Sequence, residues 1–86
     1  MDYYTRMEYD RVVNDLNSMY TKKDGLEYSL QEARQMFEFE MSIKNYKSAD
    51  CYKTKRDEIY AQIDELDRKI GYLLRRKKEI EENDDF

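Results

Sequence analysis

The C-terminal part of the chain carries a heptad repeat of apolar residues, and this repeat limits what the chain can fold into. Between Ile59 and Ile80 the positions alternate by four and three residues, with Lys77 as the polar member. The apolar members are Ile59, Ile63, Leu66, Ile70, Leu73 and Ile80. This spacing places the side chains on one stripe of an α-helix, and the stripe needs another helix to cover it. The sequence therefore predicts a long helix packed against a second helical segment.

A second repeat of the same kind precedes the first and supplies a matching stripe. Its spacings are three and four residues throughout, and its members are Tyr9, Val12, Leu16, Met19, Lys23, Leu26, Leu30, Ala33 and Phe37. The chain has no proline and 42% charged residues, and sheet-forming patterns are missing, which favours helix throughout. Two complementary stripes on arms of similar length predict an all-α fold, an antiparallel helical hairpin of the coiled-coil type.

The connection between the two arms is predicted from the loss of apolar residues after Lys44. Ser48 is a suitable N-cap for the helix that follows, and Asp50 suits its first turn. We predict a single helical domain over residues 1–86, with a helix over about 3–45, a turn at about 45–49, a helix over about 50–81 and an acidic tail at 82–86.

Gly25 leaves two interpretations of the first arm open. The sequence Lys22-Lys23-Asp24-Gly25 is typical of a helix C-terminus, and Ser29 with Glu32 would form the capping box of a new helix. The heptad phase nevertheless continues across Gly25, as expected for one helix that tolerates a glycine at a cost of about 1 kcal/mol. The chain is thus either a straight hairpin or a hairpin bent at Gly25 into three helices. In both cases we expect a homodimer that forms a helical bundle, because a lone hairpin buries little.

The composition removes most catalytic chemistry. The 86 residues include no histidine and one cysteine, which excludes histidine-based triads and the usual zinc-ligand sets. A glycine-rich phosphate loop is also missing. We therefore expect no enzymatic activity, no catalytic residue, no metal, no cofactor and no small-molecule substrate.

Several features bear on the compartment. Cys51 is the one cysteine, so it forms no intramolecular disulfide, and the first twenty residues are charged throughout. No apolar run approaches the roughly 20 residues needed to span a bilayer. We expect a cytoplasmic protein without a membrane segment.

One short segment resembles a known family. Residues 63–74, with the sequence IDELDRKIGYLL, are similar to the first helix of the all-helical chorismate mutases. That family has an arginine after the paired leucines, where this chain has Lys77. The family's earlier substrate-binding arginine corresponds to Tyr60. The resemblance therefore implies a helical segment but does not carry over the residues that bind the substrate.

The charges argue for a protein partner. The net charge is −4, and residues 79–86 hold five acids and no base. The basic run Arg75-Arg76-Lys77-Lys78 directly precedes them, and the acids would repel the phosphates that this run could bind. We expect a protein partner and keep nucleic-acid binding through the basic run as a less favoured alternative.

Aromatic and apolar residues outside the repeats suggest where such a partner would bind. Nine tyrosines are present, and tyrosine is enriched at recognition surfaces. The candidate partner-binding residues are Met36, Phe39, Ile43 and Tyr46, which form a second apolar stripe, together with Tyr60, Tyr72, Arg75, Arg76 and Lys78.

The function predicted from these observations is that of a small non-enzymatic interaction module, acting as a regulator, adaptor or inhibitor through its helix faces and tyrosines. A narrower hypothesis is a phage or mobile-element inhibitor of a host nucleic-acid-binding enzyme such as a CRISPR nuclease. In that hypothesis the acidic segment 79–85 competes for a basic groove. A DNA-binding helical protein is the third alternative.

Overall fold

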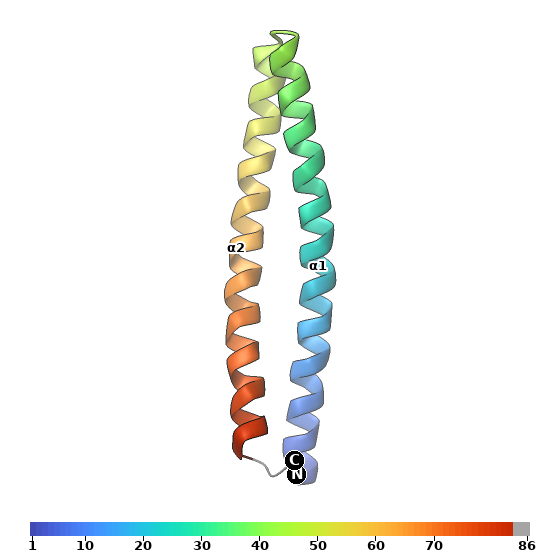
Figure 1. The fold of residues 1–86 in the computed structure, drawn as a ribbon, viewed down its shortest axis with the longest axis vertical. Helices are drawn as coiled ribbons and strands as arrows, with labels where there is room; N and C mark the ends of the chain where they lie inside the picture. The colour runs from blue at the N-terminus through green and yellow to red at the C-terminus, as the bar shows by residue number, and fades with distance from the viewer. Residues whose placement is uncertain (84–86) are drawn as a thin grey trace.

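Two long antiparallel helices make up the computed structural model, which describes residues 1–83. Helix α1 spans Tyr3–Ser42 and helix α2 spans Tyr46–Asn83, and they lie side by side along a rod of 62 × 15 × 15 Å (Figure 1). Within residues 1–83 the structure has no strand. The all-α hairpin predicted from the heptad repeats is confirmed. We call the end with the connection the turn end, and the end where α1 begins and α2 finishes the open end.

The interface between the helices is built from the two predicted repeats. Every member of both repeats is buried or half-buried. The most deeply buried side chains are Val12, Leu16 and Ala33 on α1 and Ala49, Ile59, Leu66, Ile70 and Ile80 on α2. The tightest cluster joins Val12 and Leu16 to Ile70, with Met19 and Leu73 packed against it. This cluster lies in the half of the rod toward the open end.

The stripe on α2 begins earlier than its apolar residues indicate. Ala49, which is 1% exposed, and the half-buried Tyr52 and Arg56 continue the three-and-four spacing back to the turn. Arg56 was not predicted as an interface residue because it is charged. Its guanidinium lies over the ring of Phe37, 5.5 Å from the ring centroid, so a cation–π contact takes the place of an aliphatic pair there.

The connection occupies residues 43–45 instead of the predicted 45–49. Lys44 adopts a left-handed conformation, with φ of 60°. Its N–H donates to the Met41 carbonyl, and the Asn45 N–H donates to the Glu40 carbonyl, which is the Schellman pattern of helix termination. Ser48 consequently lies inside α2 and is not its N-cap. The position of this turn could not be predicted from the sequence, because a lysine takes the left-handed position that glycine usually fills.

Helix α1 passes through Gly25 without a break. Gly25 does not have a positive φ, so the left-handed cap that one interpretation required is not formed. The N-cap of α1 is Asp2, whose side chain accepts a hydrogen bond from the Thr5 N–H at 2.7 Å. This bond lowers the pKa of Asp2.

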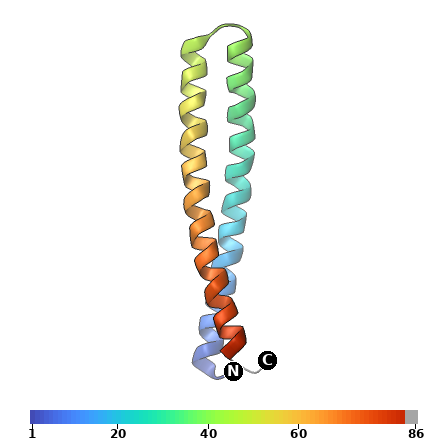
Figure 2. The same cartoon turned by 60° about the vertical axis from the view of Figure 1, so that its left-hand side comes forward.

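The two helix axes twist around each other. Figure 1 shows the helices next to each other along their length, whereas the turned view of Figure 2 shows them apart at the turn end and crossing toward the open end. Such winding keeps two heptad stripes in contact over a long interface. Neither described helix holds a stretch long and apolar enough to cross a membrane.

Candidate functional site

Large apolar side chains remain exposed around the turn, where the predicted second stripe lies. Phe39 is 55% exposed, Ile43 56% and Tyr46 57%, and Met36 is also exposed. Met36 and Phe39 belong to α1 and Ile43 caps it, so these three share one side of the turn end. Tyr46 is the first residue of α2, so its spacing from Ile43 does not make it part of the same helix face.

The residues beside the interface form two flanks, which the heptad positions describe. The heptad positions are lettered a to g, with the interface residues at a and d. The spacing within each helix then puts Ile59 and Leu66 at position d of α2 and Tyr9 and Leu16 at position a of α1. Lys23, at position a of α1, contacts Asp67, at position e of α2, with Nζ and Oδ1 2.7 Å apart. Position e of α2 therefore lies beside position a of α1, and position e of α1 is on that same side. Positions g of the two helices meet on the opposite side.

The flank formed by positions g is polar except at its turn end, where Met36 and Ile43 occupy position g of α1. The Glu8 carboxylate accepts from the guanidinium of Arg76 at 2.6 Å, and both residues occupy position g. This bond and a second one to Glu79 raise the pKa of Arg76. Farther along, Lys22, Gln62 and Lys69 line a shallow groove on the same side. We call this side the polar flank.

The flank formed by positions e is apolar at six of its places. The side chains there are Val13, Tyr20 and Met41 on α1 and Tyr46, Tyr60 and Leu74 on α2. Val13 is half-buried and the other five are between 42% and 57% exposed. We call this side the apolar flank. Tyr46 and Tyr60 were predicted from the sequence as partner-binding residues and the other members were not, although seven- and fourteen-residue spacings connect several of them.

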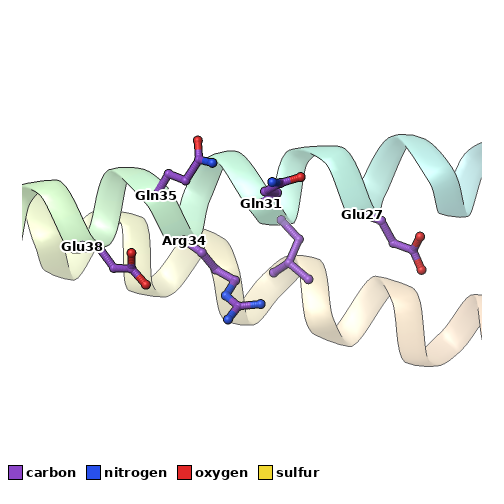
Figure 3. Close-up of a pocket in the computed structure, with 6 residues that line it drawn as sticks. Glu27, Gln31, Arg34, Gln35 and Glu38 are labelled. Carbon is purple, nitrogen blue, oxygen red and sulfur yellow. The ribbon is translucent and has the colours of Figure 1, made fainter.

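A polar groove interrupts the apolar flank on α1 (Figure 3). Glu27, Leu30 and Arg34 line it together with residues of the outer face of α1. The Arg34 side chain extends toward α2, whereas Gln35 points away from it (Figure 3). The groove is shallow and lined by ordinary helix-surface residues. Its chemistry is that of a contact surface with charge and hydrogen-bonding groups.

A cluster at the open end joins three polar side chains across the interface. The Tyr9 hydroxyl donates to Glu81 at 3.0 Å, Lys77 pairs with Glu81 at 2.9 Å, and the Lys77 ammonium lies 6.0 Å from the Tyr9 ring centroid. Hydrogen bonds from Lys77 and Tyr9 lower the pKa of Glu81, and the bond to Glu81 raises the pKa of Tyr9. Lys77, the polar member of the heptad repeat, is thus accommodated by partners from both helices.

The basic run is largely engaged with acids. Arg76 pairs with Glu8 and Glu79, as described above, Lys77 pairs with Glu81, and Lys78 lies 3.8 Å from Glu82. Arg75 is exposed. The acids that were expected to repel phosphates from a distance are in fact the direct partners of these bases.

The remaining candidate residues are exposed and separate from one another. Tyr72 is 63% exposed and occupies position c of α2, away from the apolar flank where Tyr60 lies. Cys51 is exposed and unpaired by a disulfide. Among residues 1–83, no group of three or more histidine, cysteine, aspartate or glutamate side chains is arranged to hold a metal ion.

The comparisons with known proteins yielded no relatives: no protein-family model, no curated protein and no solved structure matches this chain.

Proposed function

We propose that this chain is a non-enzymatic protein-interaction module that acts as a regulator, adaptor or inhibitor through the surfaces of its helices. The proposal has two parts. One is binding of a foreign protein at the turn end, and the other is association of two copies into a helical bundle.

The observation that carries the proposal is the exposed apolar group at the turn. Met36, Phe39 and Ile43 lie together on one side of the rod, although the adjoining interface is already filled by Ala33, Phe37 and Ala49. Hydrophobic side chains scattered singly over a surface need no explanation, but a contiguous group of large ones indicates a binding surface. We call these three residues the turn patch.

The turn patch also has the rigidity that recognition requires. Met36 and Phe39 project from a regular helix, and the Schellman bonds of Lys44 and Asn45 fix the backbone that follows Ile43. A rigid apolar surface loses little conformational freedom when a partner covers it, so more of the contact energy contributes to affinity.

The ion pairs of the basic run 75–78 make nucleic-acid binding a less favoured function. Three of the four bases in the run 75–78 are paired with glutamates of the same molecule, so phosphates would have to displace carboxylates. The inhibitor hypothesis based on a free acidic tail also loses support. Glu79, Glu81 and Glu82 are held by these pairs within α2, and residues 84–86 lie outside the described part of the chain.

A differential pull-down tests the turn patch. Tagged wild type, Phe39→Glu and Tyr28→Glu are used as baits in extract of the source cells, and bound proteins are compared by quantitative mass spectrometry. Tyr28 is 67% exposed and lies away from the turn patch, so it is a matched control for adding one charge to an exposed aromatic position. We expect a partner that binds the wild type and Tyr28→Glu but is lost with Phe39→Glu.

Two results would count against the proposal. Recovery of no protein except the bait itself would remove the foreign partner. Equal recovery by Phe39→Glu and Tyr28→Glu would show that the turn patch is not the binding surface. Circular dichroism of both variants checks that the helices are intact, which is expected because both substitutions are at exposed helix positions.

A further inference from the structure

The apolar flank is distinct from the turn patch and has its own order of charges. From the turn end to the open end, positions e of α2 are Tyr46, Lys53, Tyr60, Asp67, Leu74 and Glu81. Those of α1 are Met41, Arg34, Glu27, Tyr20, Val13 and Arg6 in the same direction. The contacts of Asp67 with Lys23 and of Glu81 with Tyr9 set how these two series align. The bases Arg34 and Lys53 consequently share one level toward the turn, and Asp67 lies toward the open end.

We propose that a second copy of this chain docks on the apolar flank, with its turn end directed toward the open end of the first copy. This inference deepens the proposed function, because it identifies one partner and the surface that this partner uses. The resulting four-helix bundle has a two-fold axis perpendicular to the rods, so that α1 faces α1 and α2 faces α2 of the partner.

Apolar matching sets the register of this dimer. If the axis passes beside Glu27 and Tyr60, Met41 of one copy lies over Val13 of the other, and Tyr46 lies over Leu74. Each of these contacts occurs twice because of the symmetry. The apolar levels at the two ends of the overlap are then covered, and the Tyr60 side chains of the two copies meet at the axis.

Charge matching favours the same register and orientation. Lys53 of one copy lies over Asp67 of the other, and Arg34 lies over the Tyr20 ring, a favourable cation–π geometry. The two Glu27 carboxylates approach each other at the axis, where the Tyr60 hydroxyls are available as donors. A parallel arrangement would instead bring Arg34 and Lys53 of both copies to one level, which places four bases together.

The area of the apolar flank reaches the lower limit for a specific dimer. A fully covered tyrosine side chain buries about 150–250 Å². Three of the six flank residues are tyrosines and the other three are smaller, so covering their exposed parts on both copies removes on the order of 1,000 Å² from water in total, which is the lower limit for a specific interface. The polar flank offers no comparable series along its length, because only Met36 and Ile43, at its turn end, are large apolar residues among its g positions.

Sedimentation equilibrium tests the surface. The wild type is expected to reach twice the chain mass of 10.6 kDa over a wide range of concentration. Tyr60→Glu, which adds like charges at the axis, is expected to raise the dimer dissociation constant at least about 30-fold. Tyr72→Glu is the matched control, because Tyr72 is also an exposed tyrosine of α2 but lies outside the flank, and it should remain dimeric.

Disulfide trapping tests the orientation. In a Cys51→Ser background, Glu27→Cys is expected to form a covalent dimer with oxidised glutathione, and so is the double variant Met41→Cys with Val13→Cys. Met41→Cys alone should give no covalent dimer, and only a mixed disulfide with glutathione, because residue 41 does not face residue 41 of the partner. A covalent dimer through Met41→Cys alone would overturn the antiparallel arrangement.

The outcomes separate this inference from the turn-patch proposal. A monomeric wild type at every concentration, or equal dissociation constants for Tyr60→Glu and Tyr72→Glu, would overturn docking on the apolar flank. Phe39→Glu is expected to sediment as a dimer like the wild type, because Phe39 lies outside this flank. Loss of the foreign partner with that variant, in a chain that still dimerises, would confirm that the two surfaces act separately.

Discussion

The two halves of the rod differ in the residues that are most deeply buried at their interface. Toward the open end, Val12, Leu16 and Ile70 form a buried cluster, and the polar neighbours Tyr9, Lys77 and Glu81 bond across the interface. Toward the turn, the most deeply buried residues are Ala33 and Ala49, while Met36, Phe39, Ile43 and Tyr46 remain exposed.

Under the proposed function, this difference separates stability from recognition along one rod, although Tyr3 and Tyr4 are also exposed at the open end. Burial of large side chains stabilises the open-end half. The half at the turn has Ala33 and Ala49 at its interface beside Phe37 and Ile59, and Met36, Phe39 and Ile43 are available for other contacts. A single pair of helices can hold both functions because a heptad stripe occupies only part of each helix surface.

The largest contrast is expected between Leu16→Ala and Phe39→Ala. Leu16 is 4% exposed, so its truncation leaves a cavity and should lower the free energy of unfolding by about 2–4 kcal/mol. Phe39→Ala should change it by less than about 0.5 kcal/mol. Guanidinium unfolding followed by circular dichroism measures both. Losses of equal size would mean that the turn half is covered in the folded protein.

Gly25→Ala tests the continuity that links the two halves. A Cβ atom at Gly25 would meet nothing within 4 Å, and the backbone there does not have a positive φ. Alanine should therefore raise the free energy of unfolding by about 0.5–1 kcal/mol through helix propensity. If Gly25 instead capped a broken helix, the same substitution would lower the thermal midpoint.

Lys44→Gly sharpens the comparison at the turn. The left-handed conformation costs a lysine roughly 1–2 kcal/mol, and glycine at position 44 removes this cost. Part of that gain in stability is lost because glycine has greater conformational freedom in the unfolded chain. A net stabilisation of about 0.5 kcal/mol is expected, measured by the same denaturant titration. Lys47→Gly, inside α2, is the control and should destabilise the protein.

Acid should affect the open end through Glu81. The folded state lowers the pKa of this carboxyl through its bonds to Lys77 and Tyr9, so its contribution is present above about pH 4.5 and is lost as the pH falls through the folded-state pKa. The difference between the thermal midpoints at pH 7 and pH 3 should therefore be smaller for Glu81→Gln than for the wild type. Glu58→Gln, at an exposed position without an ion pair among the described residues, should behave like the wild type.

Much of the fold could be predicted because the heptad repeats are local. The stripes from Tyr9 to Phe37 and from Ile59 to Ile80 depend only on the spacing of residues within one helix. The candidate residues Met36, Phe39 and Ile43 were found by the same logic. Arg76 and Lys78 were chosen from sequence as contact residues, yet they pair with acids of the same molecule, one of which, Glu8, is far away in the chain.

By itself the sequence determined that two long helices form and which stripe of each is buried, because periodicity acts at short range. Only the tertiary structure decided what lies beside what. It placed the turn at Lys44, brought Arg56 over Phe37, and put the e positions of both helices on one side of the rod. Those arrangements depend on the alignment of two segments remote in sequence, which no property of either segment alone specifies.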